Sequence, residues 1–182
     1  MVKRARKTFL KKKTFRKIAA NYSYKRFSIL YRVSYDTTGV KILEMTNDNK
    51  VPLSTALGNC PDFKENAKLY HSYKLRGVKI ETIPSFPIDN TTATGAVAFA
   101  LMTNRDNDNF DHVIECDSCV VLSPLEGRNK YVPLNGGNGW MGVDITNNND
   151  GVFVAKSSMN AQSGGQMWYV RLTFYTLLKN AN

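Results

Sequence analysis

The sequence predicts an all-β protein: a single eight-stranded jelly-roll sandwich preceded by a basic, disordered N-terminal arm. From residue 24 onward the chain is rich in Val, Thr, Tyr and Phe, is punctuated by Gly, Asn and Pro, and has few runs of helix formers. About eight strand-like runs are separated by uneven loops, without alternating strands and helices, which favours a two-sheet sandwich or jelly roll over an immunoglobulin-like fold. The third observation is that the positive charge is concentrated at one end.

The first predicted unit is the basic arm, residues 1–23, and the second is the jelly-roll domain, residues 24–182. The first 32 residues hold 12 Lys or Arg and no acidic residue, whereas the rest of the chain holds 13 basic and 15 acidic residues. Like charges repel one another and cannot be buried against a core, so we expect the arm to be disordered until it meets a polyanion.

The composition of the arm indicates binding to nucleic acid. Nine cations within 17 residues can neutralise phosphates and release counterions, and the phenylalanines between them can stack on unpaired bases. The same residues satisfy the basic requirement of a nuclear-import signal, whereas no motif for sequence-specific readout accompanies them. The predicted nucleic-acid-binding residues are Lys3, Arg4, Arg6, Lys7, Phe9, Lys11, Lys12, Lys13, Phe15, Arg16, Lys17, Lys25, Arg26 and Arg32.

The first half of the domain contains the strongest strand patterns. From residue 24 the period is two, with Phe27 to Tyr35 alternately on one face and Arg26 and Arg32 on the other. A short strand follows at 40–45, and 53–68 is expected to hold one or two helical turns. In the strand at 69–84 the apolar phase slips, which predicts a bulge at Gly77. The small apolar run at 95–103 suits a central strand packed on both faces.

Shorter strands are expected in the second half. They lie at 113–122, interrupted at Asp117 and Ser118, and at 128–134, 140–146, 152–155 and 167–178. Residues 147–151 form the predicted hairpin turn between 140–146 and 152–155, with Asp-Gly suited to positive φ angles. In the last strand the apolar residues from Trp168 to Phe174 alternate with polar ones.

No catalytic residue, cofactor site or metal site is predicted. The chain has two histidines in unrelated contexts and none of the common nucleophile, zinc-protease or phosphate-loop motifs. His112, Cys116 and Cys119 offer three zinc ligands without a fourth, and two thiols on a strand are the simpler interpretation. Asp106, Asp108 and Asp111 form half of a calcium loop, which is more simply an acidic solvent loop, and a weak cation site between subunits stays open.

The remaining expectations concern the compartment. No apolar run approaches the roughly 20 residues that a bilayer requires, and the N-terminus lacks the apolar region of a secretory signal, so we expect cytosolic synthesis without membrane insertion. The three cysteines are then expected to be free thiols.

Several segments resemble the capsid proteins of circoviruses. The segment YHSYKLRGVKIE at 70–81, with Pro84 and Pro87, is similar to the strand in which a tyrosine-rich entry leads to a Lys-Val-Lys-Val-Glu core and a proline pair. The similarity continues in TGAVA at 94–98, the acidic loop at 106–111, RNKYVP at 128–133 and YVRLTFY at 169–175. The chain is shorter and its arm less rich in Arg, which favours a related circular single-stranded DNA virus over a circovirus proper.

The resemblance implies a virion protein. Sixty copies of a jelly roll would close into the smallest icosahedral shell, with the arms turned inward onto a circular single-stranded DNA genome, and a host nuclear import receptor would bring the subunits to the nucleus for assembly. Sixty copies of the first 32 residues would supply on the order of 700 positive charges, so residues of the body or small cations would have to help neutralise a genome of one or two kilobases. Two alternatives share the same plan: a cellular, non-catalytic nucleic-acid-binding β-domain with a basic tail, and the coat protein of an RNA satellite virus. An enzyme is a distant third.

Overall fold

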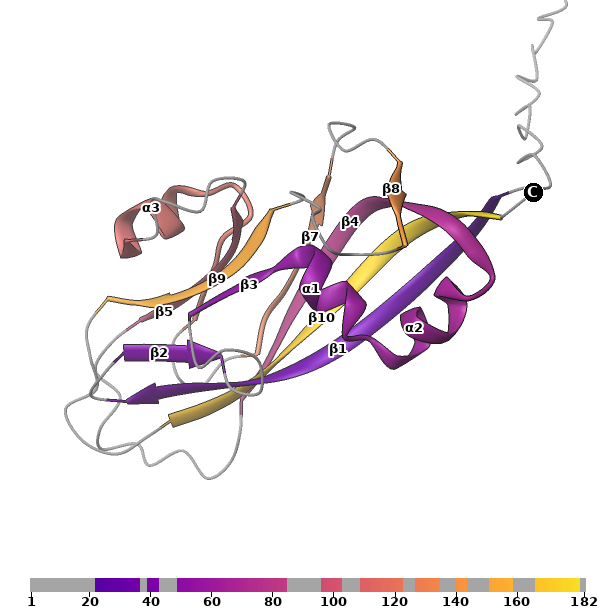
Figure 1. Cartoon of the computed structure of the whole chain (residues 1–182). Coiled ribbons are helices and arrows are strands. Elements are labelled where there is room, and N and C mark those ends of the chain that lie inside the picture. The colour runs from indigo at the N-terminus through magenta and orange to yellow at the C-terminus, as the bar shows by residue number, and fades with distance from the viewer. Residues whose placement is uncertain are drawn as a thin grey trace, which may run out of the picture.

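Two antiparallel sheets and three short helices form the part of the chain that this computed structural model describes, namely residues 22–36, 39–42, 49–84, 96–102, 109–122, 127–134, 140–143, 151–158 and 166–180 (Figure 1). Sheet A contains β1 (Tyr22–Asp36), β2 (Gly39–Ile42), β4 (Tyr70–Pro84), β7 (Asn129–Pro133), β8 (Met141–Gly142) and β10 (Gln166–Asn180). Sheet B contains β3 (Lys50–Pro52), β5 (Val97–Met102), β6 (Val120–Leu122) and β9 (Val152–Ser157). The helices are α1 (Leu53–Gly58), α2 (Pro61–Ala67) and α3 (Phe110–Glu115).

The strand order is that of a jelly roll. With the short strands β2 and β8 set aside, sheet A has the order β1-β10-β4-β7 and sheet B the order β3-β9-β5-β6. Counted from one to eight along the chain, these orders are 1-8-3-6 and 2-7-4-5, and every connection except that between β5 and β6 crosses from one sheet to the other. The predicted all-β, eight-stranded jelly roll is therefore confirmed.

Two of the long strands of sheet A, β1 and β10, bury alternate residues, as their sequences predict. Phe27, Tyr31 and Val33 of β1 are buried, and so are Trp168 and Phe174 of β10. The two strands pair in one unbroken antiparallel register from Tyr22 to Tyr35. The inner face of sheet A is thus apolar, and every second residue of β1 and β10 lies on the outer face.

The predicted bulge in β4 is also confirmed. The register with β10 shifts by one residue between the pairs Tyr175–Gly77 and Thr176–Leu75, so Arg76 is the extra residue. Leu75 and Val78 have opposite parity in the sequence, yet both are buried on the inner face. A bulge next to a glycine restores one continuous apolar face to a strand whose pattern slips.

Helix α3 corrects the prediction of a strand over 113–122, of which only β6 is extended. The Asn109 side chain accepts a hydrogen bond from the His112 backbone N–H at 2.8 Å, an N-cap that starts a helix instead of a strand. Helix α3 lies beside β5 and β9 of sheet B (Figure 1). Its Val113 packs with Ala98 and Ala100 of β5 on the outer face of that sheet. The predicted two-sided burial of β5 is confirmed, because α3 covers one side and sheet A the other.

The predicted hairpin between 140–146 and 152–155 is wrong. Strand β8 pairs with β4 in sheet A, whereas β9 pairs with β3 and β5 in sheet B. A jelly roll sends these consecutive segments to opposite sheets, and local turn signals cannot reveal that. Gly151 does have the expected positive φ, at 108°.

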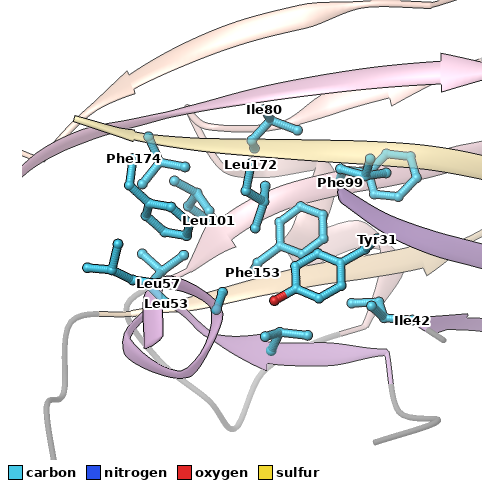
Figure 2. Packing of buried hydrophobic residues seen from close by; sticks show 14 of the residues in the cluster. Tyr31, Ile42, Leu53, Leu57, Ile80, Phe99, Leu101, Phe153, Leu172 and Phe174 are labelled. Atoms are coloured by element: carbon cyan, nitrogen blue, oxygen red, sulfur yellow. The ribbon is translucent and has the colours of Figure 1, made fainter. Parts of the chain in front are cut away.

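The core lies between the sheets and continues under two helices. Leu172 and Phe174 of sheet A point toward Leu101 and Phe153 of sheet B, while Leu53 and Leu57 of α1 close one end (Figure 2). The strands of sheet B have at most 6 residues against 15 in β1, β4 and β10, so α1 and α2 cover much of what sheet B leaves open. The predicted helical turns at 53–68 are confirmed. Within the described ranges no helix is long and apolar enough to cross a membrane.

Candidate nucleic-acid interface

Strand β1 carries the three predicted cations that the structure describes. Arg26 and Arg32 are exposed on the outer face of sheet A, as predicted. Lys25 has the opposite parity and lies level with the buried Thr176, whose hydroxyl donates a hydrogen bond to the Lys25 carbonyl at 3.2 Å. The structure therefore places Arg26 and Arg32 on one face and leaves Lys25 off it. The eleven predicted residues from Lys3 to Lys17 lie outside the described residues.

The strand register brings further cations onto the same face. In one cross-strand row Leu30 of β1 lies beside Arg171 of β10, and in another Ser28 and Thr173 lie beside Lys79 of β4. Residues directly opposite one another in an antiparallel sheet share a face. The cations assigned to the outer face of sheet A in this way are Arg26, Arg32, Lys41, Lys74, Lys79, Arg171 and Lys179.

Five of these seven cations were not predicted as site residues. Lys74 and Lys79 alternate with buried residues in β4, and Arg171 and Lys179 do so in β10. The alternation itself could have assigned each one to a solvent face. That the faces of β1, β4 and β10 combine into one surface depends on β10 lying between β1 and β4, a long-range pairing that the alternation does not specify.

Glu81 is the sole acid among the side chains described on this face. Its Oε2 lies 3.4 Å from Arg171 Nη1 and 3.9 Å from Lys79 Nζ, and all three side chains are partly exposed. Ion pairs in contact with water stabilise a fold little. The main effect of Glu81 is to neutralise part of the positive potential of a face on which the structure describes the side chains of seven cations and one acid.

Tyrosines lie among these cations. The Arg26 guanidinium lies 5.2 Å from the centre of the Tyr175 ring, and Tyr131 meets Tyr175 edge to face at 5.2 Å. The Tyr131 ring covers Gly77, where a Cβ atom would collide with it. The bulge therefore makes room for an aromatic side chain on the outer face. Cations combined with aromatic rings are typical of surfaces that bind single-stranded nucleic acid.

The outer face of sheet B is different in kind. Its side chains include Ala98, Ala100, Val152 and Val154, which are buried under α3. Lys130 of β7 also lies away from the cationic face, because its ammonium donates a hydrogen bond to the Cys119 carbonyl at 3.1 Å. Seven of the described cations thus lie on the outer face of the sheet into which the basic arm runs.

His112, Cys116 and Cys119, the possible zinc ligands, do not form a ligand cluster. Cys116 Sγ donates to the His112 carbonyl at 3.3 Å, as expected within one helix. In the part of the chain that the structure describes, no three His, Cys, Asp or Glu side chains gather in a way that could hold a metal ion. Asp106 and Asp108 lie outside the described residues, and Asp111 is exposed in the first turn of α3.

The three cysteines are free and are held in the thiol form. Burial, and next the charge of Asp62, raises the pKa of Cys60 to about 12. Burial also raises the pKa of Cys116, with Asp117 adding to the effect, and that of Cys119, where Lys130 offsets part of it. A raised pKa lowers the thiolate fraction at neutral pH, and the thiolate is the reactive form.

These pKa shifts predict slow thiol labelling. With a chromogenic disulfide reagent at pH 7.5, we expect Cys116 and Cys119 to react more slowly than free cysteine and Cys60 to react only on unfolding. The rate should go on rising to a higher pH than it does for free cysteine, because each thiol loses its proton at a higher pH than usual. A control in denaturant should count three thiols at once, and rapid labelling of the native protein would contradict the assignment.

Comparisons with known proteins show the fold. No protein-family model matches the sequence, and no curated protein matches it. A chain of Mud crab tombus-like virus superposes with a TM-score of 0.63 at 14% identity, covering 100% of this chain and 91% of its own. The capsid protein deletion mutant in the T=1 subviral particle of Penaeus vannamei nodavirus gives a TM-score of 0.63 at 11% identity, covering 87% and 97%.

The resemblance to circovirus capsid proteins receives weaker support. The decameric BFDV capsid protein superposes with a TM-score of 0.51 at 13% identity, covering 87% of this chain and 99% of its own. Because the tombus-like and nodavirus chains superpose better, the likeness does not single out circoviruses. At these identities it shows that the chain has a jelly-roll fold shared with viral capsid proteins.

Proposed function

We propose that this chain is a viral capsid protein that assembles into a small icosahedral shell and packages circular single-stranded DNA through its basic arm. One observation carries the proposal: the chain has a jelly roll like that of capsid proteins, and the outer face of its sheet A is cationic. The basic arm is continuous with β1 of that sheet. The role is structural and involves no catalysis.

The charge distribution supports assembly around nucleic acid. After residue 32 the chain is nearly neutral, so copies of the domain do not strongly repel one another, whereas the arms repel until a polyanion neutralises them. Arg26 and Arg32 already count among the 12 basic residues of the first 32. In a shell of sixty subunits, the other five cations described on the outer face of sheet A, less Glu81, would therefore add about 240 positive charges. The body thereby supplies part of the neutralisation that the arms alone leave incomplete.

The partners in this role are identical subunits and the genome. The basic arm also has the composition of a nuclear-import signal that a host import receptor would bind. Assembly would then take place in the nucleus, and the mature protein would reside in the virion. Import can be tested separately, by fusing residues 1–23 to a fluorescent protein and comparing its location with that of a fusion whose Lys and Arg are replaced by Gln.

Negative-stain microscopy of the purified full-length protein tests the proposal. We expect uniform closed shells, and sequencing of the enclosed nucleic acid should return circular single-stranded DNA. A strictly monomeric protein at every salt and protein concentration would rule out a capsid. Stoichiometric binding to one RNA without assembly would favour a cellular binding module, and shells that enclose RNA would favour an RNA satellite virus.

Replacing Glu81 with Gln should strengthen binding to nucleic acid. The change removes the described acid from the cationic face and keeps the shape of the side chain, so we expect about a two- to fivefold higher affinity for a single-stranded oligonucleotide at low salt. The ion pairs lost are partly exposed, so stability should change by less than about 1 kcal/mol. Fluorescence anisotropy measures the affinity.

Glu115→Gln is the matched control for this variant. Glu115 is exposed on α3, beside sheet B, and its removal changes the total charge by the same amount. An equal gain in both variants would mean that net charge, and not the outer face of sheet A, governs binding.

A further inference from the structure

Two exposed aromatic side chains and one half-buried one lie where the basic arm joins sheet A. The rings of Tyr22 and Trp140 stack with centroids 5.4 Å apart and an interplanar angle of 20°. Trp140 is 43% exposed and Tyr24, two residues along β1, is 57% exposed. The second tryptophan, Trp168, is only 1% exposed, so the fold can bury a tryptophan ring that is part of the core, unlike the ring of Trp140.

The sheet register explains why these residues lie together. Tyr22 and Tyr24 occupy the outer face at the start of β1, opposite Lys179 and Leu177 of β10. Trp140 immediately precedes β8, which pairs with β4 at Ser72 and Tyr73, in the same rows of the sheet. Figure 1 shows β8 beside the end of sheet A where β1 begins and β10 ends. We call Tyr22, Tyr24 and Trp140 the aromatic platform.

Two lysines flank the aromatic platform. Lys179 lies opposite Tyr22, and Lys74 lies opposite Leu177, in the row of Tyr24. The described residues of these rows include no acid, and the chain N-terminal to Tyr22 has nine Lys or Arg and no acid. A second copy of this face would bring like charges together, which disfavours an isologous protein contact. The surroundings instead favour an anionic partner with flat apolar groups.

We propose that the aromatic platform is a stacking site for unpaired bases of single-stranded nucleic acid, with Lys74 and Lys179 contacting the adjoining phosphates. This inference rests on the proposed function and adds a binding mode to it. Any base presents a π face, so stacking tolerates any sequence, and it requires bases that are not already stacked in a duplex. The platform would thus select single strands at the point where the arm meets the body.

The test uses nucleic-acid-free full-length protein and two probes, a 20-nucleotide oligothymidylate and an abasic oligonucleotide of the same length and charge. We expect roughly tenfold tighter binding of the oligothymidylate. Binding should also quench the emission of Trp140. With excitation selective for tryptophan, the quenching should be lost in Trp140→Leu, which leaves the buried Trp168 as the remaining tryptophan.

Tyr24→Ser provides a variant that does not depend on the packing of Trp140. It should reduce the preference for bases over abasic sites severalfold, with the salt dependence unchanged because no cation is removed. Ile114→Ser is the control, since it removes an exposed apolar side chain, 41% exposed, from α3 beside sheet B, away from the cationic face. It should leave the preference intact.

The outcomes separate this inference from the proposed function. Equal affinity for the two probes would overturn the stacking site and leave nucleic-acid binding standing, as would a loss of shell assembly in Tyr24→Ser without a change in base preference. An equal loss in Ile114→Ser would overturn the location of the site. Failure to bind either probe would overturn the proposed function together with the inference.

Discussion

Removing residues 2–20 is expected to abolish packaging while leaving the domain folded. The deletion takes away nine cations, and each phosphate contact on a single strand contributes about 0.7 to the slope of log affinity against log salt. If each cation contacts one phosphate, the slope should fall by about 6. Affinity for single-stranded DNA at low salt should then fall by several orders of magnitude. Titrations at a series of salt concentrations measure both quantities.

The fold should survive this deletion because β1 begins at Tyr22 and because the like charges of the deleted residues cannot be buried against a core. The free energy of unfolding should therefore change by less than about 1 kcal/mol. A variant of full length with the nine Lys and Arg replaced by Gln is the control for chain length. An unchanged salt slope in both variants would show that the body alone binds the nucleic acid.

Deleting the arm should not abolish all binding to single-stranded DNA, because the cationic face of sheet A remains. The deletion variant should keep a shallower salt dependence, and Glu81→Gln should raise its affinity as in the full chain. If the deletion variant binds nothing even at low salt, the outer face of sheet A has no part in recognition. The contributions of the arm and of the cationic face to binding can thus be measured separately, although β1 connects the two.

Local periodicity predicted the parts of the fold that depend on neighbouring residues. The buried face of β1, the bulge beside Gly77 and the two-sided burial of β5 each follow from which residues of one segment are apolar. Helix α3 was missed because its signal is a single Asn109 cap before a short run that also reads as a strand. A helix of 6 residues has too few turns for its periodicity to stand out.

The candidate site was predicted where it depends on composition and missed where it depends on pairing. Arg26 and Arg32 belong to the same charge block as the arm, so the sequence alone identifies them as candidate binding residues. Lys79 and Arg171 come from segments of balanced charge and become part of one surface only because β10 lies between β1 and β4. The contact between Trp140 and Tyr22 is even harder to predict, because it depends on the pairing of β8 with β4. Such contacts are fixed by the jelly-roll topology.

The largest effect on stability is expected from Phe63→Ala. Phe63 of α2 is fully buried and meets Phe27 of β1 edge to face at 5.2 Å and Tyr73 of β4 at 5.5 Å. Beyond the short strands of sheet B, this ring helps to cover the inner face of sheet A and touches both strands that flank β10. Truncation removes its transfer free energy and leaves a cavity that 15-residue strands cannot easily close, so we expect a loss of about 3–5 kcal/mol.

Chemical denaturation measures this loss as a lower midpoint with an unchanged slope, and Lys64→Ala, an exposed position in the same helix, should change stability by less than about 0.5 kcal/mol. Because Phe63 lies on the inner face, the variant should bind single-stranded DNA with normal affinity under conditions in which it is folded. Weaker binding by the folded variant would mean that the outer face of sheet A depends on the packing beneath it. A loss below about 1 kcal/mol would show that α2 is not part of the cooperative core.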